Sequence, residues 1–264
     1  MQKPYRYGLK ISYDGTGFPG FARQGIDRSS VIEVLEDAVR EFLRSDVKLR
    51  GASRTDSGVS AQAQWIDFDF DGLLPEKAFK LGMRPLLPFT IQIEKMILRE
   101  DFSSRHHSCG KWYRYHIWTG FDRPPLSIKK WCFHYFLENS NLVFMNQALA
   151  GLIGEHDFSA FRSAHCSAAH AIRRIEDIKV SRSSERPELL YVDVWGNAFV
   201  MHQVRIIAGT LIDILNGSIK HTMLELLSSK DRTITGQTLP GSGLCLMHMY
   251  FPFMEEEAEN RIWI

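Results

Sequence analysis

The stretch RGASRTDSGVSAQAQWIDFDF, residues 50–70, combines a polar loop with a predicted strand that follows it. In the loop, the carboxylate of Asp56 comes two residues after the guanidinium of Arg54 and two residues before Gly58. Small residues and a glycine let the backbone turn sharply, so that the carboxylate points into a cleft. An arginine this close holds a carboxylate ionised and oriented. The alternative is a surface turn with an incidental pair of charges, and spacing alone leaves both open.

The strand in this stretch is predicted from residues 66–70, where apolar side chains alternate with Asp67 and Asp69. A period of two indicates one apolar face. Residues 5–13 alternate in the same way, and the glycines of residues 14–17 then predict a loop. The sequence predicts further strands at residues 90–98, 111–118, 189–195 and 244–250.

The predicted helices have recognisable ends. Ser30 and Glu33 have the spacing of a capping box, and apolar residues follow at helical spacing from Val31 to Phe42. Gly217 is placed to end a later helix. The sequence predicts the remaining helices at residues 76–83, 141–153, 199–216 and 222–229.

Strands that alternate in polarity are typical of antiparallel sheets with one face covered by helices. We therefore expect an α+β fold, mainly antiparallel, with helices on one face. A boundary near residue 100 would give an N-terminal half, residues 1–100, that carries the Asp56 loop. The C-terminal half, residues 101–264, would complete the site and end in an acidic tail.

The charge is unevenly distributed along the 264 residues, although the net charge is only +1. The last ten residues carry −3, so residues 1–254 carry +4. Residues 162–174 contain Arg162, Arg173, Arg174 and two histidines without any acid. Such a cluster is able to follow phosphates, although a solvated face is the commoner explanation of a charge run.

Composition argues against several classes of protein. No apolar run approaches the roughly 18 residues that span a bilayer, and no secretory signal is visible, so we expect a cytoplasmic protein. The cysteines form no C-x-x-C pair, and no two histidines have the spacing of a zinc-binding helix. No glycine-rich phosphate loop follows a strand. We expect neither a metal nor a cofactor.

Two further runs carry candidate site residues. In residues 111–117, a strand would place Tyr113 and Tyr115 on one face, where a tyrosine at a sheet edge is able to stack on a nucleobase. Core packing is the alternative, and we prefer it for Tyr115. In residues 199–211, helical spacing places His202 and Arg205 on the polar side.

The loop around Asp56 resembles the Arg-Thr-Asp-Ala-Gly-Val-His-Ala signature of the bacterial tRNA pseudouridine synthase A family, with Ser57 and Ser60 as departures. Five other blocks resemble the same family in the same order and spacing. They are residues 13–21, 101–115, 154–162, 199–211 and 239–246, and Ala22, His106 and Ile206 depart from the family's usual residues in or beside them.

The resemblance implies an isomerase that converts uridine to pseudouridine at positions 38–40 in the anticodon stem-loop of tRNA. It implies that Asp56 is the catalytic residue and that Arg54 helps to extrude the target nucleotide. Tyr113 would stack on the flipped uracil, and Arg205 would pair with Asp56. It also implies a homodimer, two similar halves that flank a basic cleft, and a reaction without cofactor, metal or ATP.

Two alternatives remain open at this point. A sister pseudouridine synthase with another RNA target would retain the same chemistry. A non-catalytic RNA-binding protein would use the same sheet and basic cleft, but it would have little reason to retain Asp56 together with Arg54 and Arg205.

Overall fold

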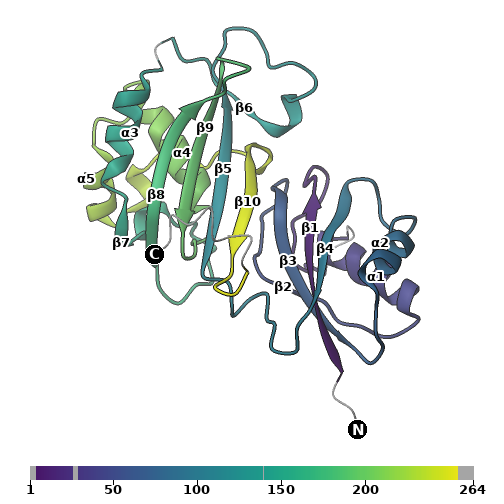
Figure 1. Ribbon diagram of the computed structural model, residues 1–264. Helices are drawn as coiled ribbons and strands as arrows, with labels where there is room; N and C mark the ends of the chain where they lie inside the picture. Colours follow the sequence, from purple (N-terminus) through teal and green to yellow (C-terminus); the bar gives the residue numbers. More distant parts are fainter. Residues whose placement is uncertain (1–3, 26–28, 139, 255–264) are drawn as a thin grey trace. The chain divides into compact units, whose positions relative to one another are not determined.

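The computed structural model describes residues 4–25, 29–138 and 140–254. These residues form two compact units (Figure 1). The first contains the described residues up to Cys109 together with Leu246–Met254, and the second contains Gly110–Cys245. The predicted division into halves of residues 1–100 and 101–264 remains a prediction. The acidic residues 255–264 lie outside the described residues.

The first unit is built on strands in the order β4-β1-β3-β10, with the short β2 beside β3. The pairs β1–β4, β1–β3 and β2–β3 are antiparallel. Helices α1 and α2 contact each other, and α2 packs against β4. A capping box of Ser30 and Glu33 begins α1, as predicted. The elements are β1 (Tyr5–Tyr13), α1 (Val31–Leu43), β2 (Arg50–Gly51), β3 (Ser60–Phe70), α2 (Glu76–Met83), β4 (Ile91–Leu98) and β10 (Leu244–Tyr250).

The second unit is a sheet in the order β5-β9-β8-β7, all antiparallel, with β6 parallel to β5. Helix α3 packs on β8, α4 packs on β5, and the two helices contact each other, so they cover the same face (Figure 1). The elements are β5 (Gly110–Trp118), β6 (Phe133–His134), α3 (Leu142–Ala150), β7 (Gly154–Asp157), β8 (Ile172–Arg182), β9 (Leu189–Gly196), α4 (Gln203–Leu215) and α5 (Met223–Ser229). Short 3-10 turns lie at Lys129–Trp131, Ser159–Phe161, Arg232–Ile234 and Gly241–Gly243.

The α+β class and the mainly antiparallel pairing are confirmed. Strands β7 and β8 were not predicted, and α4 begins at Gln203 instead of residue 199. The residue before α4, His202, has φ 66°, and a left-handed backbone cannot continue a right-handed helix. The prediction that His202 lies on the polar side of a helix is therefore wrong.

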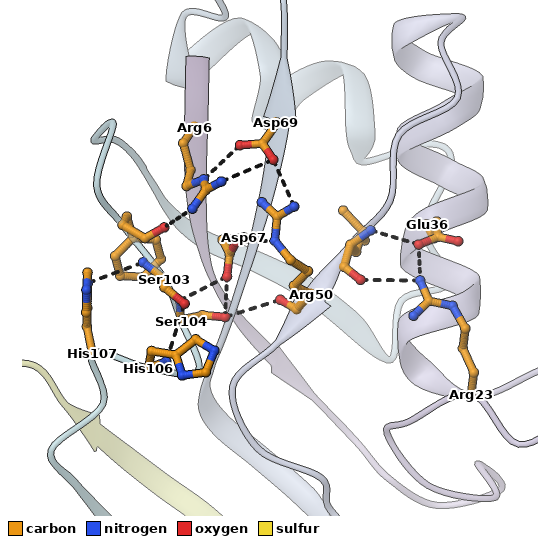
Figure 2. Close-up of polar contacts among 12 residues, drawn as sticks. Arg6, Arg23, Glu36, Arg50, Asp67, Asp69, Ser103, Ser104, His106 and His107 are labelled. Atoms are coloured by element: carbon orange, nitrogen blue, oxygen red, sulfur yellow. Dashed lines mark hydrogen bonds and ion pairs between the residues drawn. The ribbon is translucent and has the colours of Figure 1, made fainter. Parts of the chain in front are cut away.

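Part of the charged face of β3 is buried, which the alternating pattern did not predict. Asp67 is only 1% exposed. Its carboxylate accepts hydrogen bonds from Arg50 Nε at 2.6 Å and from the Ser104 backbone N–H at 2.9 Å and hydroxyl at 2.6 Å (Figure 2). Asp69 pairs with Arg6 Nε at 2.7 Å and with Arg50 Nη1 at 2.8 Å. This carboxylate network anchors β2, which leads directly into the Asp56 loop.

A second buried carboxylate fixes the chain just before β2. Glu36 of α1 is 5% exposed and accepts a hydrogen bond from the backbone N–H of Leu49 at 2.8 Å. It also pairs with Arg23 (Figure 2) and, at 3.0 Å, with Arg40. A buried charge is tolerated only when it is paired and hydrogen-bonded, and both conditions are met here.

We predict that Asp67→Ala lowers the free energy of unfolding by about 2–4 kcal/mol, because it leaves the Ser104 N–H and part of Arg50 without an acceptor. Asp71→Ala, which removes an exposed carboxylate from the same unit, should change it by less than about 0.5 kcal/mol. Urea denaturation measures both. Equal stability of the two variants would contradict the role given to the network.

Candidate active site

The loop that carries Asp56 joins β2 to β3 within the first unit, and its residues alternate between buried and exposed. Ser53 and Thr55 are buried at 7% exposure each, whereas Arg54 is exposed and Asp56 is half-buried. The small hydroxyl residues therefore point into the unit. Their orientation leaves the Asp56 carboxylate partly accessible, as a group that acts on a bound molecule must be.

Three hydrogen bonds hold the inward residues of the loop. The hydroxyls of Tyr13 and Thr55 lie 2.7 Å apart in a buried contact. The Thr55 carbonyl accepts a hydrogen bond from the Phe21 N–H at 3.0 Å, and the Ser53 carbonyl accepts one from Gln64 Nε2 at 2.8 Å. Because Thr55 is held through both its side chain and its carbonyl, the backbone that leads into Asp56 has little freedom.

Glycines allow the neighbouring backbone to approach this loop. A Cβ placed on Gly15 would lie 2.1 Å from the Val59 carbonyl oxygen, far inside van der Waals contact. Gly58 has a φ angle of 76°, which residues other than glycine rarely adopt. The Gly58 N–H donates to the Phe18 carbonyl at 3.3 Å. The loop is thus packed tightly against residues 15–21.

Arg54 does not pair with Asp56. Among the residues that the structure describes, the guanidinium of Arg54 forms no hydrogen bond and no ion pair, and its side chain extends into solvent. The spacing of two residues suggested that this arginine orients the carboxylate, and the geometry does not support that part of the interpretation. Arg54 remains available to a ligand.

Tyr113 lies on β5 in the second unit, with its ring edge-on to Phe199 at a centroid distance of 5.2 Å. It is 7% exposed, and Tyr115 on the same face is fully buried. The hydroxyl of Tyr115 donates to the Pro240 carbonyl at 2.8 Å. Burial raises the pKa of Tyr115 far above its ordinary value, and the charge of Arg205 opposes this rise. Tyr115 is therefore a core residue, as predicted.

Arg205 lies in the first turn of α4 and is half-buried. Its Nε donates to the Leu239 carbonyl at 2.7 Å. A cation in the first turn faces the positive end of the helix dipole, which is unfavourable. His202, which caps this helix, is a non-glycine residue with positive φ, and such a residue costs stability. Two unfavourable features at one helix end point to a functional role for that end.

The candidate residues fall into two groups. Arg54 and Asp56 belong to the first unit, and Tyr113 and Arg205 belong to the second. Sequence analysis missed the residues that hold the loop, because Tyr13 lies 42 positions before Thr55. The strict alternation that buries Tyr13 on β1 was the available signal.

The structure also bears on other kinds of site. Among residues 4–25, 29–138 and 140–254, no group of three His, Cys, Asp or Glu side chains is arranged to hold a metal ion. None of the helices in these residues is long and apolar enough to cross a membrane.

Comparison with known proteins identifies the family. A sequence model described as tRNA pseudouridine synthase matches residues 148–252. The tRNA pseudouridine synthase A of Stenotrophomonas maltophilia (strain K279a) is 36% identical over 94% of this chain and 95% of that protein. The enzyme of the same name from Myxococcus xanthus is 36% identical over 93% of this chain and 92% of that protein. The one from Geobacter sulfurreducens is 35% identical over 92% of this chain and 98% of that protein. The resemblance seen in the sequence is confirmed, and the chain belongs to the tRNA pseudouridine synthase A family.

Proposed function

We propose that this protein is an isomerase that converts uridine to pseudouridine at positions 38–40 in the anticodon stem-loop of tRNA. The observation that carries the proposal is the half-buried Asp56, presented by a tightly held loop in a chain that matches named synthases over almost its full length. The reaction breaks the N1–C1′ glycosidic bond, rotates the uracil and rejoins it to C1′ through C5. The hydrogen on C5 leaves as a proton.

Asp56 drives this reaction as an ionised carboxylate. It either attacks C1′, which gives a covalent intermediate, or removes the C2′ proton, which gives a glycal-like intermediate. In both routes one oxygen must lie within contact distance of the sugar. A carboxylate on a fixed backbone satisfies that demand better than one on a mobile loop, because misplacement by about 1 Å costs up to about a hundredfold in rate.

The other three residues act on the nucleotide and on the carboxylate. A base inside a helix must leave the stack before its glycosidic bond is accessible. The exposed guanidinium of Arg54 would fill the vacated space or hold a neighbouring phosphate. Tyr113 would stack on the extruded uracil, and Arg205 would keep Asp56 ionised in a partly dehydrated cleft between two similar halves.

We further propose that the protein acts in the cytoplasm as a homodimer, with tRNA crossing both subunits. Family membership and the modest net charge of +1 support this, because pairing two chains gives one larger basic surface. Light scattering should give the mass of two 30.4 kDa chains, and the mass of one chain would contradict the proposal.

We predict that Asp56→Asn abolishes pseudouridine formation while the fold and tRNA binding survive, because the two side chains are nearly isosteric. The assay is release of tritium from C5 of labelled uridine in tRNA. Asp56→Glu should also fail, because its extra methylene moves the oxygen from its reactive position. Asp71→Asn, the exposed control in the same unit, should retain wild-type release. Wild-type release from Asp56→Asn would overturn the assignment.

A second prediction concerns Tyr113. Tyr113→Phe keeps the ring and should bind tRNA almost normally, whereas Tyr113→Ala should lose about 1–3 kcal/mol of binding free energy through lost base stacking. Filter binding measures both, with a thermal melt to check that Tyr113→Ala remains folded. If Tyr113→Ala binds and turns over tRNA as the wild type does, the ring only packs against Phe199.

A further inference from the structure

Arg173 occupies an unusual place on β8 of the second unit. It lies two residues after Ala171 and two residues before Ile175, which are 4% and 0% exposed. Alternation along the strand therefore directs Arg173 toward the core side, where an apolar residue is expected. The neighbouring Arg174 points the other way, is exposed and pairs with Glu176 at 2.8 Å.

The half-buried guanidinium of Arg173 lacks a carboxylate. Its Nη1 donates to the Ile172 carbonyl at 2.5 Å and lies 3.4 Å from Nδ1 of His170. Its Nε is buried and has no hydrogen-bond partner among the described residues. In the same part of the chain, no acid lies within ion-pair distance of it. A cation that is partly withdrawn from water without a counterion lowers stability.

A second arginine adds to this charge. Arg162 donates from Nη2 to the Cys166 carbonyl at 3.4 Å, and no acid pairs with it among the described residues. Burial is the main cause that lowers the pKa of Arg173; Cys166 opposes this shift, and the charge of Arg162 lowers the pKa further. We call Arg162 and Arg173 the arginine pair, because the positive charge of Arg162 disfavours that of Arg173.

The arginine pair adjoins the candidate site residues of the second unit. The N–H of Ser163, next to Arg162, donates to the Met201 carbonyl at 3.1 Å. Met201 immediately precedes His202, the cap of the helix that carries Arg205. Two residues earlier, Phe199 packs against the Tyr113 ring. The same short segment therefore contacts Ser163, the neighbour of Arg162, and the tyrosine proposed to stack on the uracil.

We propose that Arg162 and Arg173 bind a backbone phosphate of the RNA beside the extruded nucleotide. Forked guanidinium groups match the geometry of phosphate oxygens, and an anion here would supply the missing counterion and an acceptor for Nε. The proposal rests on RNA as the substrate and adds a specific contact to it. The phosphate charge would hold the strand while the base leaves the stack.

The test measures binding of an anticodon stem-loop RNA in which single phosphates are replaced by uncharged methylphosphonates. All proteins carry Asp56→Asn, so that the RNA is not consumed. Arg173→Gln should weaken binding about tenfold and reduce the slope of log affinity against log salt by about 0.7–0.9. Arg174→Gln, the matched control, should change neither. One methylphosphonate should weaken binding to the Arg173-containing protein and cause no further loss in Arg173→Gln.

Stability provides an independent readout. Because Arg173 is an uncompensated cation, Arg173→Gln should melt at the same temperature as the parent or higher. Should Arg173→Gln nevertheless fail to fold, Arg162→Gln must show the same coupling to the same phosphate. Equal binding by Arg173→Gln and Arg174→Gln, or methylphosphonate effects that no variant removes, would overturn the proposal.

Two comparisons separate the possible failures. Inorganic phosphate should compete with RNA for binding to the Asp56→Asn protein. The competition should disappear when Arg173→Gln is added. Chloride at equal ionic strength is the control. If inorganic phosphate binds but no RNA phosphate couples to Arg173, the site holds free anions, and the proposed contact with an RNA phosphate is wrong. Normal tritium release by the wild type without coupling overturns this inference alone. Coupling without tritium release contradicts the proposed reaction and leaves the phosphate site standing.

Discussion

The buried hydrogen bond between the hydroxyls of Tyr13 and Thr55 is the constraint on which the candidate site depends. It joins the end of β1 to a loop whose backbone is also held by Phe21 and Gln64. Thr55 points inward, and the next residue, Asp56, is half-buried. The Asp56 carboxylate thus directly follows a residue that is held through both its side chain and its carbonyl.

Much of the first unit supports this hydrogen bond. The Asp67 and Asp69 carboxylates fix β2 and β3, the two strands that the loop connects. Glu36 fixes the chain before β2 through the Leu49 N–H, and Gln64 holds Ser53. The absence of a side chain at Gly15 lets the loop approach closely. Each contact is worth only about 0.5–3 kcal/mol, yet together they leave Asp56 one backbone position.

The second unit supplies cations where local stability does not favour them. Arg205 faces the positive end of α4, and Arg173 occupies the core side of β8 without a carboxylate. An arrangement that lowers stability persists when it serves function. Both features therefore fit a surface that is completed by a polyanion.

Local patterns in the sequence predicted most elements, because strand alternation and helix caps are short-range effects. Strand β1 and helix α2 begin and end at the predicted residues, and the predicted capping box begins α1. Strand β8 was missed because charges interrupt its alternation and its register shifts after Ile175. The start of α4 was misplaced because apolar residues continue back to Phe199, and only the backbone at His202 ends the helix there.

For the site, spacing and family resemblance predicted Asp56 but not what holds it. The contact between Tyr13 and Thr55 joins residues far apart in the chain, and no periodicity encodes such a pair. Proximity in sequence was also misleading for Arg54, because its side chain extends into solvent instead of pairing with Asp56.

A double-mutant cycle of tritium release by wild type, Tyr13→Phe, Thr55→Val and the double variant tests the central claim most directly. If the hydrogen bond positions Asp56, each single change should lower kcat by roughly tenfold to a hundredfold with little change in KM, and the double variant should be no slower than the singles. Wild-type kcat in both single variants, or losses that multiply in the double variant, would contradict it.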